Sequence, residues 1–304
     1  MDFLITVLGC NSAIPAQGRH PSAQVIDLLD KRYLIDAGEG AQLQFSRYRK
    51  SPMKVSAIFI SHLHGDHIFG LPGLLTTMNL LGRTGPLQIF GPMGLEDMMN
   101  TFLGYAGVIE LSYEVRFHTV TSPSKSLIYQ DERALVYSFP LDHKVPTFGY
   151  LIEEKMKYFN LNREALERYH IPKEDRARLA EGADWVSQEG VLIPNASLTL
   201  PKRPPRRYAY CSDTRYFPEI IPWIQGADLL YHEATYLHEM VDKAHQRFHS
   251  TALQAGQIAA AAGVKKLLLG HFSSKYKDLT SLEEEARGPF PNAYAAVEGE
   301  TYKL

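Results

Sequence analysis

Four residues in one short segment have side chains that can hold metal ions. Three imidazoles and a carboxylate occur in the run His62-Leu63-His64-Gly65-Asp66-His67. Nitrogen-rich sites with a few carboxylate oxygens are the sites that zinc prefers. If the run were extended, His62, His64 and Asp66 would face one side and His67 the other. We therefore expect two metals to share the run; the alternative, four ordinary loop residues, is disfavoured by the spacing.

A second metal needs further ligands, and three later residues are candidates because each follows an apolar run. They are His143, Asp213 and His271. The ends of strands are where α/β folds place chemistry. Taken singly, each residue is more typical of a loop or a helix cap, but the three in this order favour a metal site.

The elements around the run predict where it lies. Val55 to Ile60 is a β-branched, apolar strand that leads directly into His62. Beyond the run, a helix is predicted by Pro72 near its start, Gly82 past its end and an apolar repeat at i, i+3, i+4 and i+7. The repeat consists of Leu71, Leu74, Leu75 and Met78. The run is therefore expected on a strand-to-helix loop.

Further strands and one more helix are predicted along the chain. The helix begins with a capping-box pattern from Thr251 to Gln254 and ends at Gly263. The candidate strands are Phe3 to Leu8, Ala23 to Leu28, Arg32 to Ile35, Leu87 to Phe90, Leu135 to Phe139, Phe148 to Ile152, Arg207 to Cys211, Asp228 to Tyr231 and Lys266 to Leu269.

Composition limits the class of protein. The 304 residues carry a formal net charge of -2, which excludes a binder with a uniformly positive surface. Only two cysteines, Cys10 and Cys211, are present, so a disulfide framework and a four-thiolate zinc site are excluded. No apolar run is long enough to cross a bilayer, and the N-terminus lacks a basic signal-peptide region. We expect a cytoplasmic protein without a membrane partner.

One stretch differs in character from the rest. Residues 153–205 are rich in charged residues and contain helix-like segments with little continuous apolar sequence. We interpret residues 1–304 as one domain interrupted by an arm at 153–205; an ordinary pair of covering helices is the alternative.

The ligand candidates and several shorter motifs together resemble a known family. His62-x-His64-x-Asp66-His67 followed by His143, Asp213 and His271 is similar to the metallo-β-lactamase superfamily. Further motifs resemble those of its RNase Z family of tRNA 3′-processing endonucleases. These are Leu8-Gly9 through Pro15, Asp36-Ala37-Gly38-Glu39-Gly40, Gly70-Leu71-Pro72-Gly73-Leu74, His232-Glu233-Ala234-Thr235, His249-Ser250-Thr251 and His271-Phe272-Ser273-Ser274-Lys275-Tyr276.

The resemblance implies a fold and a set of roles. The fold is an α/β, four-layer αβ/βα sandwich, the metallo-β-lactamase fold, with an inserted helical arm. Two Zn2+ ions per subunit are implied, although the ligand types also suit Mn2+ or Fe2+. His62, His64 and His143 would hold one ion, Asp66, His67 and His271 the other, and Asp213 would bridge them. Asp66 would also act as a base, and His249, oriented by Glu233, would protonate the departing ribose 3′-oxygen.

The sequence departs from the family pattern in three places. The arm lacks the Gly-Pro element common in the family, Ser212 replaces the usual glycine before Asp213, and Lys275 stands where an arginine is common. We expect Lys275 to contact substrate with a positive charge but without a bidentate fork. Arg19 is a second candidate, expected to contact a phosphate or terminal nucleotide. Two basic clusters, 47–50 and 202–207, are further candidates for RNA contact.

The resemblance implies a zinc-dependent endoribonuclease that removes the 3′ trailer of precursor tRNA, leaving a 3′-hydroxyl on the tRNA and a 5′-phosphate on the trailer. It also implies a homodimer in which the arm of one subunit grips tRNA for the other. The first alternative is a phosphodiesterase of the same superfamily that acts on small molecules or cyclic nucleotides. The second is a metal-stabilised RNA-binding module without catalysis.

Overall fold

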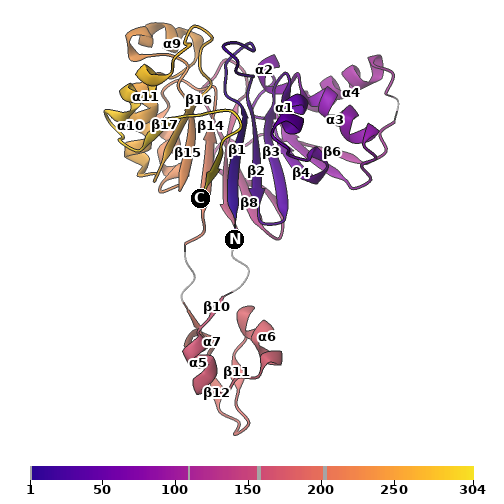
Figure 1. Cartoon of the computed structure of the whole chain (residues 1–304), viewed down its shortest axis with the longest axis vertical. Coiled ribbons are helices and arrows are strands. Elements are labelled where there is room, and N and C mark those ends of the chain that lie inside the picture. Colours follow the sequence, from indigo (N-terminus) through magenta and orange to yellow (C-terminus); the bar gives the residue numbers. More distant parts are fainter. Residues whose placement is uncertain (1, 109, 156–158, 201–203) are drawn as a thin grey trace.

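Two seven-stranded sheets pack face to face, and helices cover their outer faces (Figure 1). The computed structural model of the protein describes residues 2–108, 110–155, 159–200 and 204–304. The four-layer αβ/βα sandwich expected from the sequence is confirmed. Within these described residues no helix is long and apolar enough to span a membrane.

The first sheet has the order β18-β1-β2-β3-β4-β5-β6. Its strands β18, β1, β2 and β3 pair antiparallel, and β3 to β6 pair parallel. Its strands are β1 (Phe3–Gly9), β2 (Ala23–Leu28), β3 (Lys31–Ala37), β4 (Val55–Phe59), β5 (Leu87–Gly91), β6 (Val115–Thr119) and β18 (Thr301–Lys303).

The second sheet has the order β17-β16-β15-β14-β9-β8-β7. Here β7, β8, β9 and β14 pair antiparallel, and β14 to β17 pair parallel. Its strands are β7 (Ser126–Gln130), β8 (Ala134–Pro140), β9 (Phe148–Glu154), β14 (Arg207–Cys211), β15 (Leu229–Glu233), β16 (Leu267–Gly270) and β17 (Ala293–Ala295).

Strand β4 is apolar except at Ser56, because both of its faces are covered. Ala57 and Phe59 face the core between the two sheets, whereas Ile58 and Ile60 face the outer helices. Because a strand buried on both faces has no solvent side, it shows no alternation of apolar and polar residues.

The helices lie over the outer faces of the two sheets (Figure 1). The predicted helices after Gly70 and Thr251 are confirmed as α3 and α10; α10 has the predicted capping box and a left-handed Gly263 at its C-cap. The helices of the sandwich are α1 (Ala41–Arg47), α2 (Gly65–Ile68), α3 (Leu71–Leu80), α4 (Leu95–Tyr105), α8 (Ile221–Ile224), α9 (Val241–Arg247), α10 (Ala252–Ala262) and α11 (Thr280–Arg287). The 3₁₀ turns of the chain are η1 (Pro52–Lys54), η2 (Lys173–Asp175), η3 (Pro218–Ile220) and η4 (His238–Met240).

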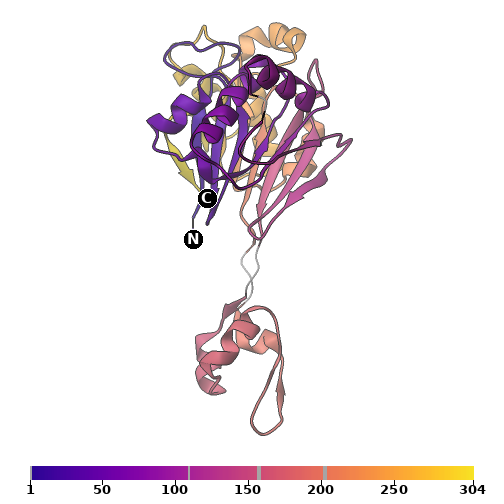
Figure 2. The ribbon, with the colours of Figure 1, turned by 90° about the vertical axis from the view of Figure 1, so that its right-hand side faces the viewer.

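Residues 159–200 form a small lobe between the neighbouring strands β9 and β14, away from the sandwich (Figures 1 and 2). The lobe has its own buried cluster, which includes Leu166, Leu179 and Leu198. Besides η2, its elements are β10 (Asn160–Leu161), α5 (Arg163–Arg168), α6 (Arg176–Ala180), β11 (Trp185–Val186), β12 (Leu192–Ile193), α7 (Asn195–Leu198) and β13 (Thr199–Leu200). At the edges of the expected 153–205 segment, Glu153 and Glu154 belong to β9, and 201–203 lie outside the described residues.

Candidate metal centre

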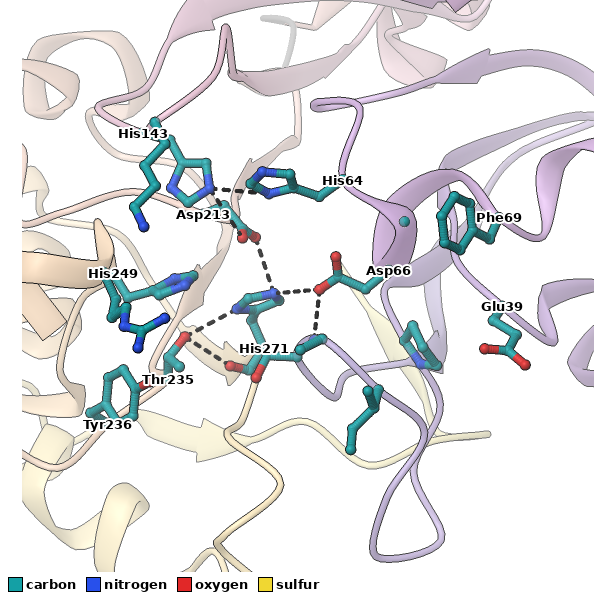
Figure 3. Close-up of a pocket in the computed structure, with 17 residues that line it drawn as sticks. Glu39, His64, Asp66, Phe69, His143, Asp213, Thr235, Tyr236, His249 and His271 are labelled. Atoms are coloured by element: carbon teal, nitrogen blue, oxygen red, sulfur yellow. Dashed lines mark hydrogen bonds and ion pairs between the residues drawn. The ribbon is translucent and has the colours of Figure 1, made fainter. Parts of the chain in front are cut away.

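The metal-ligand candidates all follow the ends of strands, and the two sheets bring these ends to one edge of the sandwich. His62 and His64 follow β4, and the short helix α2 carries Asp66 and His67. The others follow β8, β14 and β16 of the second sheet, and Figure 3 shows them converging on one pocket. They are His143, Asp213 and His271.

Three overlapping groups of possible ligands form in this pocket, and within each group the ligand atoms lie within 4.8 Å of one another. The first group is His62, His64, His143 and Asp213, and the second is Asp66, His67 and His271. The third, Asp213, His249 and His271, shares Asp213 and His271 with the other two. Asp213 faces both the first and the second group, because its Oδ2 lies 3.7 Å from His62 Nε2 and its Oδ1 3.1 Å from His67 Nε2. The structure thus brings together all seven ligands predicted from the sequence.

In the first group, ring nitrogens of the three histidines face one another, and a cation between them could accept their lone pairs. His143 Nδ1 lies 2.9 Å from the carbonyl of Phe248, so this nitrogen is the donor and Nε2 keeps its lone pair. His64 Nδ1 lies 3.3 Å from that Nε2 and 2.9 Å from His62 Nε2. Burial lowers the pKa of all three imidazoles, which favours the neutral form, in which each ring keeps one nitrogen with a free lone pair. This donor set fits a divalent metal.

In the second group, each histidine ring is held in place through its Nδ1 atom. His67 Nδ1 lies 2.7 Å from the carboxylate of Asp36, and His271 Nδ1 lies 3.0 Å from Thr235 Oγ1. His67 Nε2 is buried and has no hydrogen-bond partner within the described part of the chain. A histidine that donates through one nitrogen and points the other at its neighbours is the usual arrangement of a metal ligand. The second group therefore also fits a metal.

Asp36 is a buried carboxylate that supports this arrangement. Its oxygens accept from Ser61 N at 2.7 Å, from Ser61 Oγ at 2.9 Å and from Tyr210 Oη at 2.7 Å, in addition to His67. The residue is fully buried, so these donors offset the cost of its desolvation. Asp36 belongs to the motif at residues 36–40, but the sequence indicated no role for it beyond its position near the end of β3.

Three residues of the site adopt backbone conformations that favour glycine. Asp36, Asp213 and His271 have φ of 56°, 62° and 55°. A non-glycine residue there is strained by roughly 1 kcal/mol or more. Asp213 and His271 follow strands and line the pocket, and Asp36 lies next to the end of β3, so the strained conformations occur where these strands end.

Glu233 and His249 form a pair beside the ligands. His249 Nδ1 lies 3.0 Å from Glu233 Oε1, and its ring centroid lies 5.3 Å from that of His271. Burial raises the pKa of Glu233, but His249 and its other neighbours lower it below its usual value. Burial likewise lowers the pKa of His249, but the Glu233 carboxylate raises it to about 9. The geometry gives an ion pair with its proton held on the imidazole.

Thr235 joins this pair to the metal-ligand candidates. Its hydroxyl donates to Glu233 Oε2 at 2.6 Å, and it can then accept from His271 Nδ1. Glu233 also accepts from the backbone of Thr214 at 2.6 Å and of Ser250 at 3.0 Å. The carboxylate is therefore fixed on all sides, and so is the imidazole that it holds.

Arg19 forms hydrogen bonds within the protein, and its expected contact with a phosphate or terminal nucleotide stays a prediction. Its guanidinium donates to the carbonyls of Tyr276 at 2.5 Å and Lys277 at 3.4 Å, and its Nε donates to Asn11 Oδ1 at 3.1 Å. These bonds join the loop after β1 to the loop after β16. This link between the loops could not be expected from the sequence, because the two loops are more than 250 residues apart in the chain.

Lys275, the other substrate-binding candidate, is exposed and lies outside the pocket lining. Its ammonium contacts the sulfur of Met240 and lies 4.4 Å from the ring centroid of Tyr276. The pocket has a volume of about 630 Å³. Its lining also includes Glu39, from the motif at residues 36–40, and residues that carried no expectation from the sequence. They are Pro21, Phe69, Lys144, Tyr236 and Arg247.

Two facing sheets with clustered histidines and aspartates at one edge define a protein of the metallo-β-lactamase fold. The structure superposes on the short form of human tRNase Z with a TM-score of 0.70 and 25% identity, covering 98% of each chain. A family model described as anti-Pycsar protein Apyc1 matches residues 3–287.

Curated relatives identify the family more closely. Ribonuclease Z of Porphyromonas gingivalis is 49% identical over 296 residues, covering 97% of each chain. Ribonuclease Z of Parabacteroides distasonis is 47% identical over 298 residues, covering 98% of each. The chain belongs to the Ribonuclease Z family.

Proposed function

We propose that this chain is a metal-dependent endoribonuclease that removes the 3′ trailer from precursor tRNA. The products are a 3′-hydroxyl on the tRNA and a 5′-phosphate on the trailer. The observation that carries the proposal is the Glu233–His249 pair 3.0 Å apart beside two groups of metal-ligand candidates. The names of the curated relatives and the human structure support tRNA as the substrate.

The seven clustered residues would hold two divalent ions, which we propose to be Zn2+. His62, His64 and His143 would hold one, Asp66, His67 and His271 the other, and Asp213 would bridge them. When bound, two such ions polarise the phosphodiester and make water a stronger nucleophile. Mn2+ and Fe2+ suit the same donor types.

Asp66 is proposed to act both as ligand and as base. Its Oδ2 accepts from Ala13 N at 2.7 Å and lies 3.4 Å from His271 Nε2. Burial raises the pKa of this carboxyl, but His67 and His271 hold it well below its usual range, so the group stays ionised. An ionised carboxylate fixed by a backbone amide can accept a proton from the attacking water.

His249 is proposed to protonate the departing ribose 3′-oxygen. An alkoxide is a poor leaving group, and a donor placed beside it lowers the barrier. Glu233 keeps the proton on the ring and fixes the orientation of the ring through Nδ1, which leaves Nε2 for the substrate. Thr235 and Ser250 hold Glu233 in place.

The lobe at residues 159–200, within the expected 153–205 arm, is proposed to grip tRNA.

The chain is also proposed to form a homodimer. Large apolar side chains are exposed at the C-terminal ends of the adjacent helices α3 and α4. They are Leu80, Leu81, Phe102 and Tyr105. Exposed apolar groups of this size mark contacts with other chains. The proposal predicts that Tyr105→Glu shifts the sedimentation coefficient toward that of a monomer. A cytoplasmic location stays a prediction.

A single assay tests the proposed function. Purified protein is incubated with an end-labelled precursor tRNA, with chelator and with metal added back. We expect cleavage at the 3′ end of the acceptor stem, loss with chelator, recovery with metal, and loss in Asp66→Ala with binding retained. Full activity of Asp66→Ala would overturn the mechanism.

The small-molecule alternative is tested by removing the arm. Replacing residues 156–203 by a short flexible linker should abolish precursor-tRNA cleavage and preserve hydrolysis of a chromogenic diester. If both activities survived the deletion, a small diester would be the better substrate class. Metal content without turnover of either substrate would favour a binding module.

A further inference from the structure

The pocket has chemically different ends. Figure 3 shows His249 and Tyr236 on one side of the ligand cluster and Phe69 and Glu39 on the other, with Asp66 and His271 between them. Lys144 and Arg247 also line the pocket. Lys144 directly follows the ligand candidate His143, and Arg247 lies two residues before His249.

More positive charge surrounds the His249 side. Lys243 lies 5.4 Å from the ring centroid of Tyr236, and Lys144 lies 5.9 Å from that of Phe248. Arg247 lines the pocket together with Tyr236, and the ammonium of Lys275 lies 4.4 Å from the ring centroid of Tyr276. We call these four residues the cationic rim. They are Lys144, Lys243, Arg247 and Lys275.

The rim differs from several basic groups elsewhere in the protein. All four rim side chains are exposed, and no ion pair to a carboxylate is formed by any of them within the described residues. By contrast, the basic clusters expected to bind RNA are partly used internally. Lys50 pairs with Asp27 at 3.0 Å and Arg206 with Glu154 at 2.7 Å. The rim is therefore the charge available to an anionic ligand at the pocket.

The opposite wall offers a flat apolar surface. Phe69 is 57% exposed and Ile14 is 54% exposed, although both line the pocket. The ring of Phe69 lies against Gly65, where an added Cβ would come within 2.2 Å of it. Glycine thus lets the ring lie flat on the metal-binding loop. The carboxylate of Glu39 lies on this wall and would repel a phosphate, so a base is the group that fits here.

We propose that the cationic rim and the wall with Phe69 together fix the direction in which the RNA strand lies across the site. The cationic rim binds the phosphate on the 5′ side of the last tRNA nucleotide, and Phe69 stacks on the base of the first trailer nucleotide. The inference rests on the proposed function, because His249 must protonate the 3′-oxygen of the last tRNA nucleotide and therefore lies beside it. The strand then runs past the scissile phosphate toward Phe69, where stacking holds any base without reading its identity.

The rim is tested with precursor tRNAs that carry one uncharged methylphosphonate linkage. In one substrate it replaces the phosphate on the 5′ side of the last tRNA nucleotide, and in the other the phosphate on the 3′ side of the first trailer nucleotide. Arg247→Ala should raise KM roughly tenfold on the unmodified and the downstream-modified substrates, and should have no effect on the upstream-modified one. Arg247→Lys should recover most of the loss, and Lys54→Ala, which removes an exposed charge outside the pocket lining, should match the wild type.

The wall is tested with a trailer whose first nucleotide is abasic. Phe69→Ala should lower kcat/KM roughly tenfold on the normal trailer and not on the abasic one. The proposal is overturned if the Arg247→Ala loss disappears on the downstream-modified substrate or persists on both, or if the Phe69→Ala loss persists without the base. Failure of the wild type to cleave unmodified precursor tRNA would instead overturn the proposed function.

Discussion

The Glu233 carboxylate is fully buried, yet it stays ionised because every oxygen has a donor. Four groups hold it, and one of them is the imidazole of His249. A buried carboxylate with this number of donors raises the proton affinity of the histidine it faces. The ability of His249 to hold and donate a proton therefore depends on the charge of Glu233.

Replacing Glu233 by glutamine should lower kcat about 100-fold or more and move the alkaline limb of the pH-rate profile to lower pH. His249 must hold a proton in order to donate it, and its pKa of about 9 keeps that proton through neutral pH. Without the carboxylate the pKa falls, so the proton is lost at a lower pH. The measurement is kcat against pH, with the exposed Glu284→Gln as control. An unchanged alkaline limb would show that another group donates the proton.

Asp36→Asn should weaken metal binding about 10- to 100-fold, because the second partner of a ligand histidine tunes its basicity and orientation. The amide would lack the charge that His67 Nδ1 faces at 2.7 Å. Competition with a chromogenic chelator measures the affinity. Tyr210→Phe removes one donor to Asp36 and leaves the carboxylate, so its effect should be smaller. Equal affinities for all three proteins would contradict this role.

At the scale of elements, the loops after β1 and β16 form a joined unit at the mouth of the pocket. Ser12 N donates to the carbonyl of Phe272, Phe272 N donates to that of Cys10, and Arg19 ties both loops. From the same unit, Ala13 N reaches Asp66. The position of Asp66 thus depends on the hydrogen bonds of Arg19, although Arg19 does not contact Asp66.

Arg19→Ala should therefore lower kcat about tenfold while leaving KM for precursor tRNA and its salt dependence unchanged. A phosphate contact would behave differently, because its loss reduces the salt slope by roughly one. Gln17→Ala, which removes one bond to the carbonyl of Ser274, is the milder control. A change in salt slope with kcat preserved would instead support Arg19 as an RNA contact.

Local patterns were sufficient to predict the elements that carry the site. The apolar strand at Val55, the histidine run and the helix at Leu71 are neighbours in sequence, and so the order of the residues fixes their order in space. Strand ends bearing His143, Asp213 and His271 were recognisable because buried strands are continuous apolar runs.

Elements at the sheet edges were not predictable in the same way. Strands β6, β7 and β18 are half-buried or exposed, so they lack the apolar runs that mark β4 or β16. The network around Asp36 joins residues from β3, β14 and α2, and such long-range partners leave no mark in a local pattern. Lys144, Arg247 and Phe69 were missed for the same reason.

At the scale of the molecule, the sandwich and the lobe at 159–200 have separate buried clusters. Leu198→Ala should destabilise the lobe alone, by about 2–5 kcal/mol. Hydrogen exchange should accelerate in the lobe, precursor-tRNA cleavage should fall, and the main thermal transition should stay in place. Leu269→Ala, in the core between the sheets, should lower that transition instead. A lowered main transition in Leu198→Ala would mean that the two cores unfold as one.

The left-handed residues at the strand ends have a consequence for how such a site changes over generations. Asp213 and His271 occupy positions where glycine would relieve backbone strain, so each is kept at a cost in stability, whereas Asp36 also accepts hydrogen bonds from Ser61, Tyr210 and His67. A copy of this chain released from selection for activity would gain stability by drifting to glycine at positions 213 and 271. Their persistence in a lineage would then report continued use of the site, even before any activity is measured.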